Sequence, residues 1–241
     1  MEDDLRTGVI FDIREFTVHD GPGLRITVFF KGCPLRCQWC HNPEGLTPCP
    51  QRNVMTGRMV GKEWTVSDLV GRLSRFKQAF DMSGGGVTFS GGEATLQPEF
   101  LIAVANGLRL KGVPVNLDTS GYCPAEIFMR IIDSIDMCYF DIKCMNAKLH
   151  ERMTGKRNEL ILDNLRMLSS RSAIPYRIRV PLIPGVSDTQ ENRTATLAFI
   201  DSLSRSPEGI DWLPYNKVAP AKYKNFGMVF PFNVNEVSHV E

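Results

Sequence analysis

Three cysteines near the N-terminus have the spacing C-x3-C-x2-C: Cys33, Cys37 and Cys40. Thiolates this close together can all reach one small inorganic group, and a cubane iron–sulfur cluster has four irons. Three protein ligands leave one iron open to an exogenous group, just as a missing protein ligand marks the reactive position of catalytic zinc. An electron carrier would close its cluster with a fourth cysteine. The spacing therefore predicts a 4Fe-4S cluster with an open, reactive iron.

Two other interpretations of this loop stay open. Residues 37–41 match the C-x-x-C-H pattern of c-type haem attachment. That reading leaves Cys33 unused and implies export, whereas the acidic N-terminus lacks the apolar stretch of an export signal. A structural zinc ion could take His41 or Cys49 as its fourth ligand, but no distant ligand pair of the zinc-ribbon kind accompanies the loop. The open cluster has neither weakness.

Composition sets the broad class of the protein. The chain has 241 residues, 43% of them hydrophobic, enough for one large α/β domain with a substantial core. The formal net charge is +1 without basic or acidic blocks, so electrostatics do not predict nucleic-acid binding, and no apolar run reaches membrane-spanning length. Seven cysteines without a signal peptide favour the reducing cytoplasm. We interpret Cys123, Cys138 and Cys144 as small buried hydrophobes.

Short β-rich runs alternate with longer helical patterns, which is typical of βα units around a parallel sheet. The expected strands are an edge strand at 8–14 and six barrel strands at 25–31, 87–90, 115–119, 138–143, 176–181 and 210–213. The expected helices are 67–80, with Ser67 as its N-cap, 98–111, 125–132, 146–154, 160–170 and 189–204. Six units fit an open, partial (β/α)6 TIM-like barrel better than a closed eight-stranded one. We therefore expect residues 1–241 to form a single α/β domain.

Polar residues follow the predicted barrel strands. In parallel βα folds, active-site residues gather at the carboxyl ends of the strands. After the second strand comes Ser-Gly-Gly-Glu at 90–93, whose two glycines let a ligand approach the backbone closely. The polar residues at the later strands are Asp118, Thr119, Asp141, Lys143, Arg179 and Asn216. We expect all of these motifs to meet the cysteine loop at one site.

This ordered set of motifs resembles the activating enzymes of glycyl radical enzymes, a branch of the radical S-adenosylmethionine (SAM) superfamily. The resemblance runs from about residue 11 to residue 223, and its most specific segments are 19–25, 29–43 and 90–93. A generic radical SAM enzyme would share the cysteines and the Gly-Gly-Glu. The Asp-Gly-Pro-Gly segment and the Cys-His-Asn ending of the cysteine loop point to the activase branch.

The resemblance implies a role for residues of the cysteine loop. The ligands of one 4Fe-4S cluster would be Cys33, Cys37 and Cys40. Trp39 would lie beside the adenine of SAM, with packing in the core as its alternative role. His41 and Asp20 would lie where the glycine loop of the partner enters, although a packed, hydrogen-bonded histidine is the alternative for His41.

The resemblance also assigns the strand-end residues to SAM and to a cation. Gly91, Gly92 and Glu93 would hold the methionine amino group. The residues near the methionine carboxylate and the ribose would be Lys143, Asp141, Arg179 and Asn216. A monovalent cation, Na+ or K+, would be held by Asp118, Thr119 and Asp141, because neighbouring carboxylates otherwise repel one another. The alternative for Asp118 is a cap on the turn that follows it.

The implied activity is reductive cleavage of SAM, followed by removal of a hydrogen atom from a glycine of a partner glycyl radical enzyme. Flavodoxin or ferredoxin would supply the electron to a cytoplasmic monomer that binds neither nucleic acid nor membrane. A radical SAM enzyme acting on a small molecule or peptide, or a non-catalytic zinc or iron–sulfur module, are the alternative functions.

The chain departs from the family pattern in three places. Asn216 replaces the histidine of the Leu-Pro-Tyr-His ending, so this side chain can donate a hydrogen bond but cannot carry a proton at neutral pH. Many activases carry a cysteine-rich, ferredoxin-like insert after the cysteine loop. Residues 45–62 contain a single cysteine, Cys49, so one cluster is expected. The sequence also ends soon after the sixth strand, where the family often adds a helix.

Overall fold

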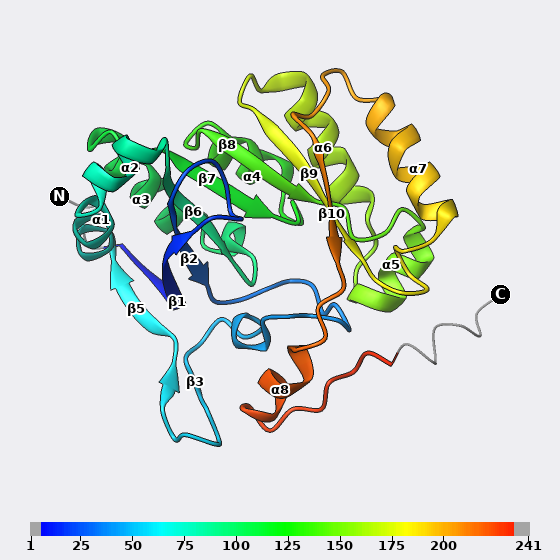
Figure 1. Cartoon of the computed structure of the whole chain (residues 1–241), viewed down its shortest axis with the longest axis horizontal. Coiled ribbons are helices and arrows are strands. Elements are labelled where there is room, and N and C mark those ends of the chain that lie inside the picture. The colour runs from blue at the N-terminus through cyan, green and yellow to red at the C-terminus, as the bar shows by residue number, and fades with distance from the viewer. Residues whose placement is uncertain (1–5, 234–241) are drawn as a thin grey trace.

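A single large sheet organises the protein, of which the computed structural model describes residues 6–233 (Figure 1). Its strand order is β10-β9-β8-β7-β6-β2-β1-β5. Six neighbouring strands are parallel: β2 (Arg25–Phe30), β6 (Gly86–Gly91), β7 (Val115–Thr119), β8 (Met137–Asp141), β9 (Tyr176–Leu182) and β10 (Ile210–Pro214). Among the described strands, β10 pairs only with β9, so the sheet stays open. The expected α/β class with six parallel strands is confirmed.

The N-terminal strand is longer than expected, and it is not at the edge of the sheet. β1 (Thr7–Thr17) pairs antiparallel with β2, and its first residues pair antiparallel with β5 (Lys62–Thr65). The prediction of an edge strand at 8–14 was therefore wrong. A second small sheet, formed by β3 (Gln51–Arg52) and β4 (Met59–Val60), was not predicted. β3, β4 and β5 have two to four residues, too few to show a period-two pattern.

The first expected helix is in fact two helices. α1 (Val66–Ser74) begins after Thr65, whose hydroxyl accepts a hydrogen bond from the amide of Asp68 at 3.1 Å, so Thr65 is the N-cap and not Ser67. α2 (Lys77–Ser83) ends at Gly84, which has a left-handed φ of 67°. The other helices are α3 (Pro98–Leu110), α4 (Ala125–Ile132), α5 (Ala147–Thr154), α6 (Glu159–Arg171), α7 (Gln190–Asp201) and α8 (Ala219–Lys224). Short 3-10 helices occupy Pro43–Gly45 and Ala94–Leu96.

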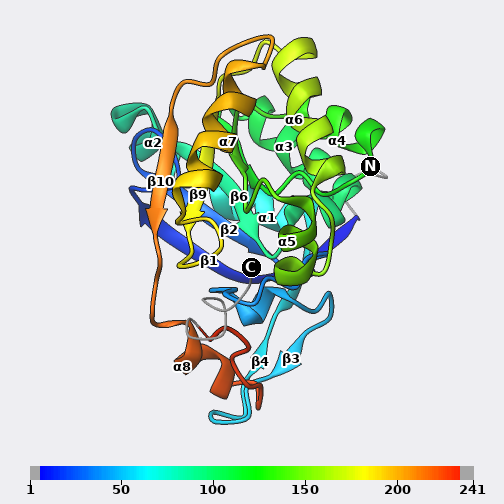
Figure 2. The ribbon, with the colours of Figure 1, turned by 90° about the vertical axis from the view of Figure 1, so that its right-hand side faces the viewer.

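The main hydrophobic core lies between the sheet and the helices that follow its strands (Figure 2). Alternate residues of β2, namely Ile26, Val28 and Phe30, are fully buried in it, as are Leu101 and Val104 of α3. Because strand side chains alternate between faces, the opposite face of the strands is left for other residues. No helix of residues 6–233 combines the length and the apolar character needed to cross a membrane.

Candidate active site at the carboxyl ends of the strands

The carboxyl ends of the parallel strands and the cysteine loop enclose a cavity of about 240 Å³. Eleven residues expected at the site line it: Cys33, Cys37, Trp39, Cys40, His41, Gly91, Gly92, Asp118, Thr119, Asp141 and Lys143. Four expected residues are not part of its lining: Asp20, Glu93, Arg179 and Asn216. The structure thus brings together motifs that lie up to 110 positions apart in the sequence, from Cys33 to Lys143.

The cysteine loop is held in place by the C-terminal end of α5. The amide of Arg36 donates to the carbonyl of Thr154 at 2.7 Å, and the amide of Gln38 donates to the carbonyl of Met153 at 2.9 Å. Both amides flank Cys37. These carbonyls belong to the last turn of α5, where no intrahelical donor is available to them. The loop therefore supplies hydrogen-bond donors to the last carbonyl groups of α5, and these hydrogen bonds hold the loop in place.

The three thiols facing the cavity fit a metal cluster. Burial raises the pKa of Cys37 to about 12, although nearby Lys143 lowers it, and burial also raises the pKa of Cys33 and Cys40. Buried thiolates of this kind need a cationic group to stabilise them, and iron or zinc supplies that charge. The donor set consists of soft thiolates, which suits an iron–sulfur cluster.

A single metal ion fits less well. Thiolates that share one zinc ion lie within about 4 Å of one another, because each Zn–S bond is about 2.3 Å long. In residues 6–233 no three His, Cys, Asp or Glu side chains converge closely enough to hold one ion. A cluster binds each thiolate through a different iron, so it accepts the wider spacing. The zinc interpretation with His41 or Cys49 is disfavoured.

Gly91, the last residue of β6, and Gly92 allow backbone to pack on backbone. A Cβ atom on Gly91, whose φ is 118°, would lie 2.3 Å from the amide nitrogen of Phe30. A Cβ atom on Gly92 would lie 2.3 Å from the carbonyl oxygens of Gly32 and Gly45. Any other residue at 91 would push β6 away from β2, and any other residue at 92 would push away the two ends of the cysteine loop.

Glu93 does not line the cavity and is almost completely buried, with 2% of its surface exposed. One carboxylate oxygen accepts from the hydroxyls of Thr119 (2.6 Å) and Thr95 (2.9 Å). The other accepts from the amide (2.9 Å) and the hydroxyl (2.6 Å) of Ser120. The glutamate therefore ties the end of β6 to the end of β7, a role that the resemblance did not indicate. Its expected contact with the methionine amino group stays a prediction.

Two carboxylates at the cavity are each paired with a cation. Asp118 accepts from the hydroxyl of Ser90 at 2.8 Å and lies 3.2 Å from a guanidinium nitrogen of Arg179. Burial raises the pKa of Asp118 to about 6, with Arg179 opposing the shift and Asp141 adding to it. Lys143 is 2.5 Å from Asp141. Burial alone would lower the pKa of Lys143, but Asp141, Cys37 and Asp118 together outweigh it and raise that pKa.

Arg179 supports Asp118 from behind the cavity wall. It also donates to the carbonyl of His19 at 2.7 Å, and its guanidinium lies over the ring of Tyr139, 4.2 Å from the centroid. Its side chain does not line the cavity wall, and its expected position near the methionine carboxylate stays a prediction.

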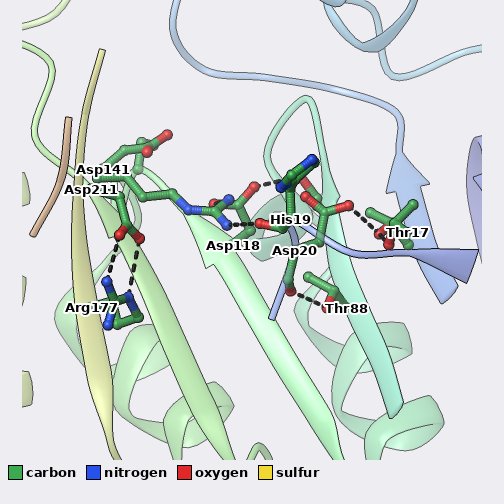
Figure 3. Close-up of polar contacts among 12 residues, drawn as sticks. Thr17, His19, Asp20, Thr88, Asp118, Asp141, Arg177 and Asp211 are labelled. Atoms are coloured by element: carbon green, nitrogen blue, oxygen red, sulfur yellow. Dashed lines mark hydrogen bonds and ion pairs between the residues drawn. The ribbon is translucent and has the colours of Figure 1, made fainter. Parts of the chain in front are cut away.

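The Asp-Gly-Pro-Gly segment lies on the polar inner face of the strands. The carboxylate of Asp20 accepts from the hydroxyl of Thr27 at 2.6 Å, and its carbonyl accepts from the hydroxyl of Thr88 at 2.7 Å (Figure 3). A Cβ atom on Gly21 would lie 2.4 Å from the side-chain nitrogen of Asn116 on β7. The segment is thereby fixed across β2, β6 and β7. The expected contact of Asp20 with a partner stays a prediction.

The C-terminal part of the described chain adds residues that sequence reasoning missed. Tyr223 of α8 is 2% exposed and lies near Cys40, and burial, with Cys40 adding to it, raises the pKa of its hydroxyl. Phe232 packs edge-on against Trp39 with ring centroids 6.2 Å apart. Asn216 is exposed, and its side-chain oxygen accepts from the amide of Val218. No local motif indicates that Tyr223 or Phe232 contacts the cysteine loop, since both lie far from this loop in the sequence.

Comparisons with known proteins agree with this geometry. The Radical SAM superfamily matches residues 27–198. The pyruvate formate-lyase-activating enzyme of Clostridium pasteurianum is 37% identical over 92% of this chain and 87% of its own length. The choline trimethylamine-lyase activating enzyme of Oleidesulfovibrio alaskensis is 31% identical over 95% of this chain and 90% of its own. The chain belongs to the glycyl-radical-enzyme activases of the radical SAM superfamily.

Solved structures place this activase in the same fold. A domain of pyruvate-formate lyase-activating enzyme from Bacteroides vulgatus is 32% identical, with a TM-score of 0.53, and the match covers 64% of this chain and 96% of that domain. Streptococcus suis SuiB bound to S-adenosylmethionine matches 86% of this chain and 43% of its own with a TM-score of 0.57. At 14% identity, the second match is a likeness of fold alone.

Proposed function

We propose that this activase cleaves SAM reductively and makes a glycyl radical on a partner enzyme. The observation that carries the proposal is the meeting of Cys33, Cys37 and Cys40 with Asp118 and Lys143 in one cavity. When bound, the cluster supplies one electron to the sulfonium of SAM, which gives methionine and a 5′-deoxyadenosyl radical able to take a hydrogen atom from a glycine α-carbon. The three thiolates would hold that cluster.

The residues of the chain would orient SAM and exclude water. Lys143 would offer its ammonium to the methionine carboxylate, while Asp141 keeps that ammonium in position. Trp39, buried between the loop and Phe232, would present its ring to the adenine. Gly91 and Gly92 would let the ligand approach the backbone, and Glu93 would hold the β6 and β7 ends at the right separation.

A monovalent cation would complete the site. Asp118, Thr119 and Asp141 line the same cavity, and Asp141 raises the pKa of Asp118, as neighbouring carboxylates do. A Na+ or K+ ion between them and the methionine carboxylate would relieve this repulsion. Its presence would appear as a dependence of SAM affinity on the K+ or Na+ concentration at constant ionic strength.

The electron donor would be a flavodoxin or ferredoxin, and the protein would act as a cytoplasmic monomer. All seven cysteines are free, as a reducing compartment requires. We also propose a single domain with one cluster. The segment before β5 supports it, because Cys49 is exposed there beside the β3–β4 ribbon. The alignment with the O. alaskensis activase spans 281 positions, so that relative has residues without a counterpart among these 241.

Anaerobic reconstitution followed by product analysis tests this function. With SAM and dithionite, the wild-type protein should load about four irons per chain and form 5′-deoxyadenosine. Cys37→Ala should abolish the product. Cys49→Ser is the matched control and should leave iron content and product unchanged, because this thiol is exposed outside the cavity. Loading near eight irons, or loss of iron in Cys49→Ser, would show that the ligand set is wrong.

A further inference from the structure

The cysteine loop has an outer side that faces solvent. Its cavity side carries the three ligands together with Leu35 and Trp39, whereas Arg36 is exposed and Gln38 is partly exposed. The C-terminal turn of α5 packs against this outer side. Besides the two backbone contacts already described, the side-chain amide of Gln38 donates to the carbonyl of Arg152 at 3.3 Å. Solvent therefore reaches the ligand loop at Arg36 and Gln38, beside α5, which Figure 2 shows near the viewer.

The surface around this contact, which we call the α5 face, is basic. Arg36 and residues 148–159 define this face and contribute five basic side chains, Arg36, Lys148, Arg152, Lys156 and Arg157, and two acidic ones, Glu151 and Glu159. All seven are exposed. Both acidic residues pair with Arg157, at 3.8 and 2.5 Å. Within residues 6–233 the other four basic residues form no ion pair. The net charge of the whole chain is only +1, so this face is more positive than the chain as a whole.

The opposite side of the loop is covered. Tyr223 of α8 lies against Cys40, and Lys222 is taken up by Glu44 at 3.5 Å and by the side-chain oxygen of Asn42 at 3.1 Å. The remaining side of the ligand loop is the cavity itself, which SAM and the partner's glycine must share. A protein that approaches the cysteine loop from outside the cavity and away from α8 thus meets the α5 face.

We propose that the α5 face is the docking surface of a small acidic one-electron carrier protein. The proposal rests on the proposed function, because it presupposes a cluster that a protein reduces. One electron leaves the reduced carrier, which is oxidised by one electron, and enters the cluster, which is reduced by one. Electron transfer needs close approach but no atomic contact with the cluster, whereas hydrogen abstraction needs the glycine inside the cavity. Opposite charge on the two surfaces steers such an encounter.

A charge reversal on α5 tests the proposal. Lys148 and Arg152 lie one helical turn apart on α5, and neither side chain takes part in holding the cysteine loop. With reduced flavodoxin at low salt, Lys148→Glu/Arg152→Glu should raise the apparent KM for flavodoxin by about tenfold or more. The difference should shrink as salt is added. With dithionite, which needs no docking surface, 5′-deoxyadenosine should form at the wild-type rate.

Two matched variants carry the same change of charge elsewhere. Arg75→Glu/Lys111→Glu reverses exposed residues beside α1 and α3, at the other end of the long axis in Figure 1, and should leave the KM unchanged. Lys217→Glu/Lys224→Glu reverses exposed residues around α8 and should have the smaller effect. An unchanged KM in the α5 variant, a larger rise in the α8 variant, or an equal loss with dithionite would each overturn the proposal. If the wild type made no 5′-deoxyadenosine even with dithionite, the proposed function itself would be wrong.

Discussion

Lys143 and Glu93 are both charged residues at the carboxyl ends of strands, but their surroundings differ, and so do the contacts that each can make. Lys143 lines the cavity and has Asp141 as its ion-pair partner, so its remaining N–H groups can turn to a ligand. Glu93 has both oxygens engaged by protein donors. Residue types and positions along the chain predicted that both belong near the site. They could not predict which way the carboxylate points, because that depends on the hydroxyls of Thr119 and Ser120 on another strand end.

Lys143→Ala should weaken the binding of SAM at least tenfold. The ammonium is a partly desolvated charge facing a carboxylate, an interaction that contributes about 1.5–3 kcal/mol. Equilibrium dialysis of the reconstituted protein under anaerobic conditions measures it, with exposed Lys111→Ala as the control. Unchanged affinity in Lys143→Ala would remove this lysine from the site.

Glu93→Gln should destabilise the protein even without any ligand. Hydrogen bonds to a charged acceptor contribute about 1.5–3 kcal/mol, and each kcal/mol shifts the Tm of a chain this size by about 2–4 °C. We expect the Tm of the cluster-free protein to fall by roughly 3–12 °C. A normal Tm combined with weaker SAM binding would instead assign Glu93 to the ligand, as the resemblance implies.

Among the elements, the buried strands were the most predictable. Parallel strands covered by helices are apolar runs bounded by turn residues, and β7 was expected with its observed bounds. β5 contains Lys62 and Glu63 and has four residues, so nothing in it indicates a strand before β1 is in place. The break between α1 and α2 could not be predicted from the sequence either. Phe76 leaves the helical path there and packs edge-on against Phe16, with ring centroids 5.8 Å apart, a contact that the helical pattern alone does not contain.

β10 is the last strand on the open side of the sheet, and an ion pair helps to attach it. Arg177 of β9 lies 2.5 Å from Asp211 of β10 and lowers the pKa of this carboxyl group by hydrogen bonding (Figure 3). A lowered folded-state pKa contributes stability that is present above the unfolded pKa of about 3.9 and is lost as the pH falls through the folded value.

Asp211→Asn should therefore lower the Tm at pH 7 and reduce the sensitivity to acid. The pair is about 30% exposed on each side, so we expect a loss of about 1 kcal/mol, or about 2–4 °C. Thermal unfolding of the cluster-free protein at pH 7, 5 and 3 measures the effect. The difference between variant and wild type should vanish toward pH 3; a constant difference would mean that the ion pair is not its cause.

For the whole molecule, the order of motifs and strands along the chain was easier to predict than the contact of its C-terminal part with the cysteine loop. The cysteine loop, the strand-end motifs and the open parallel sheet were all foreseen from residues 11–223. The cover that α8 and Phe232 place over Cys40 and Trp39 was not. It depends on long-range packing of a segment without a motif. The cysteine loop thus has the cavity on one side and the α5 face on the other.

Transfer of deuterium from the partner to SAM-derived product tests the central claim most directly. Partner enzymes of the kinds activated by the relatives, such as pyruvate formate-lyase and choline trimethylamine-lyase, would be prepared with α-deuterated glycine. Each would be incubated with this protein, SAM and dithionite without oxygen. We expect 5′-deoxyadenosine carrying one deuterium, together with the electron paramagnetic resonance signal of a glycyl radical on a partner. Formation of 5′-deoxyadenosine without deuterium, and no radical on any partner, would contradict the account and favour a small molecule or peptide as substrate.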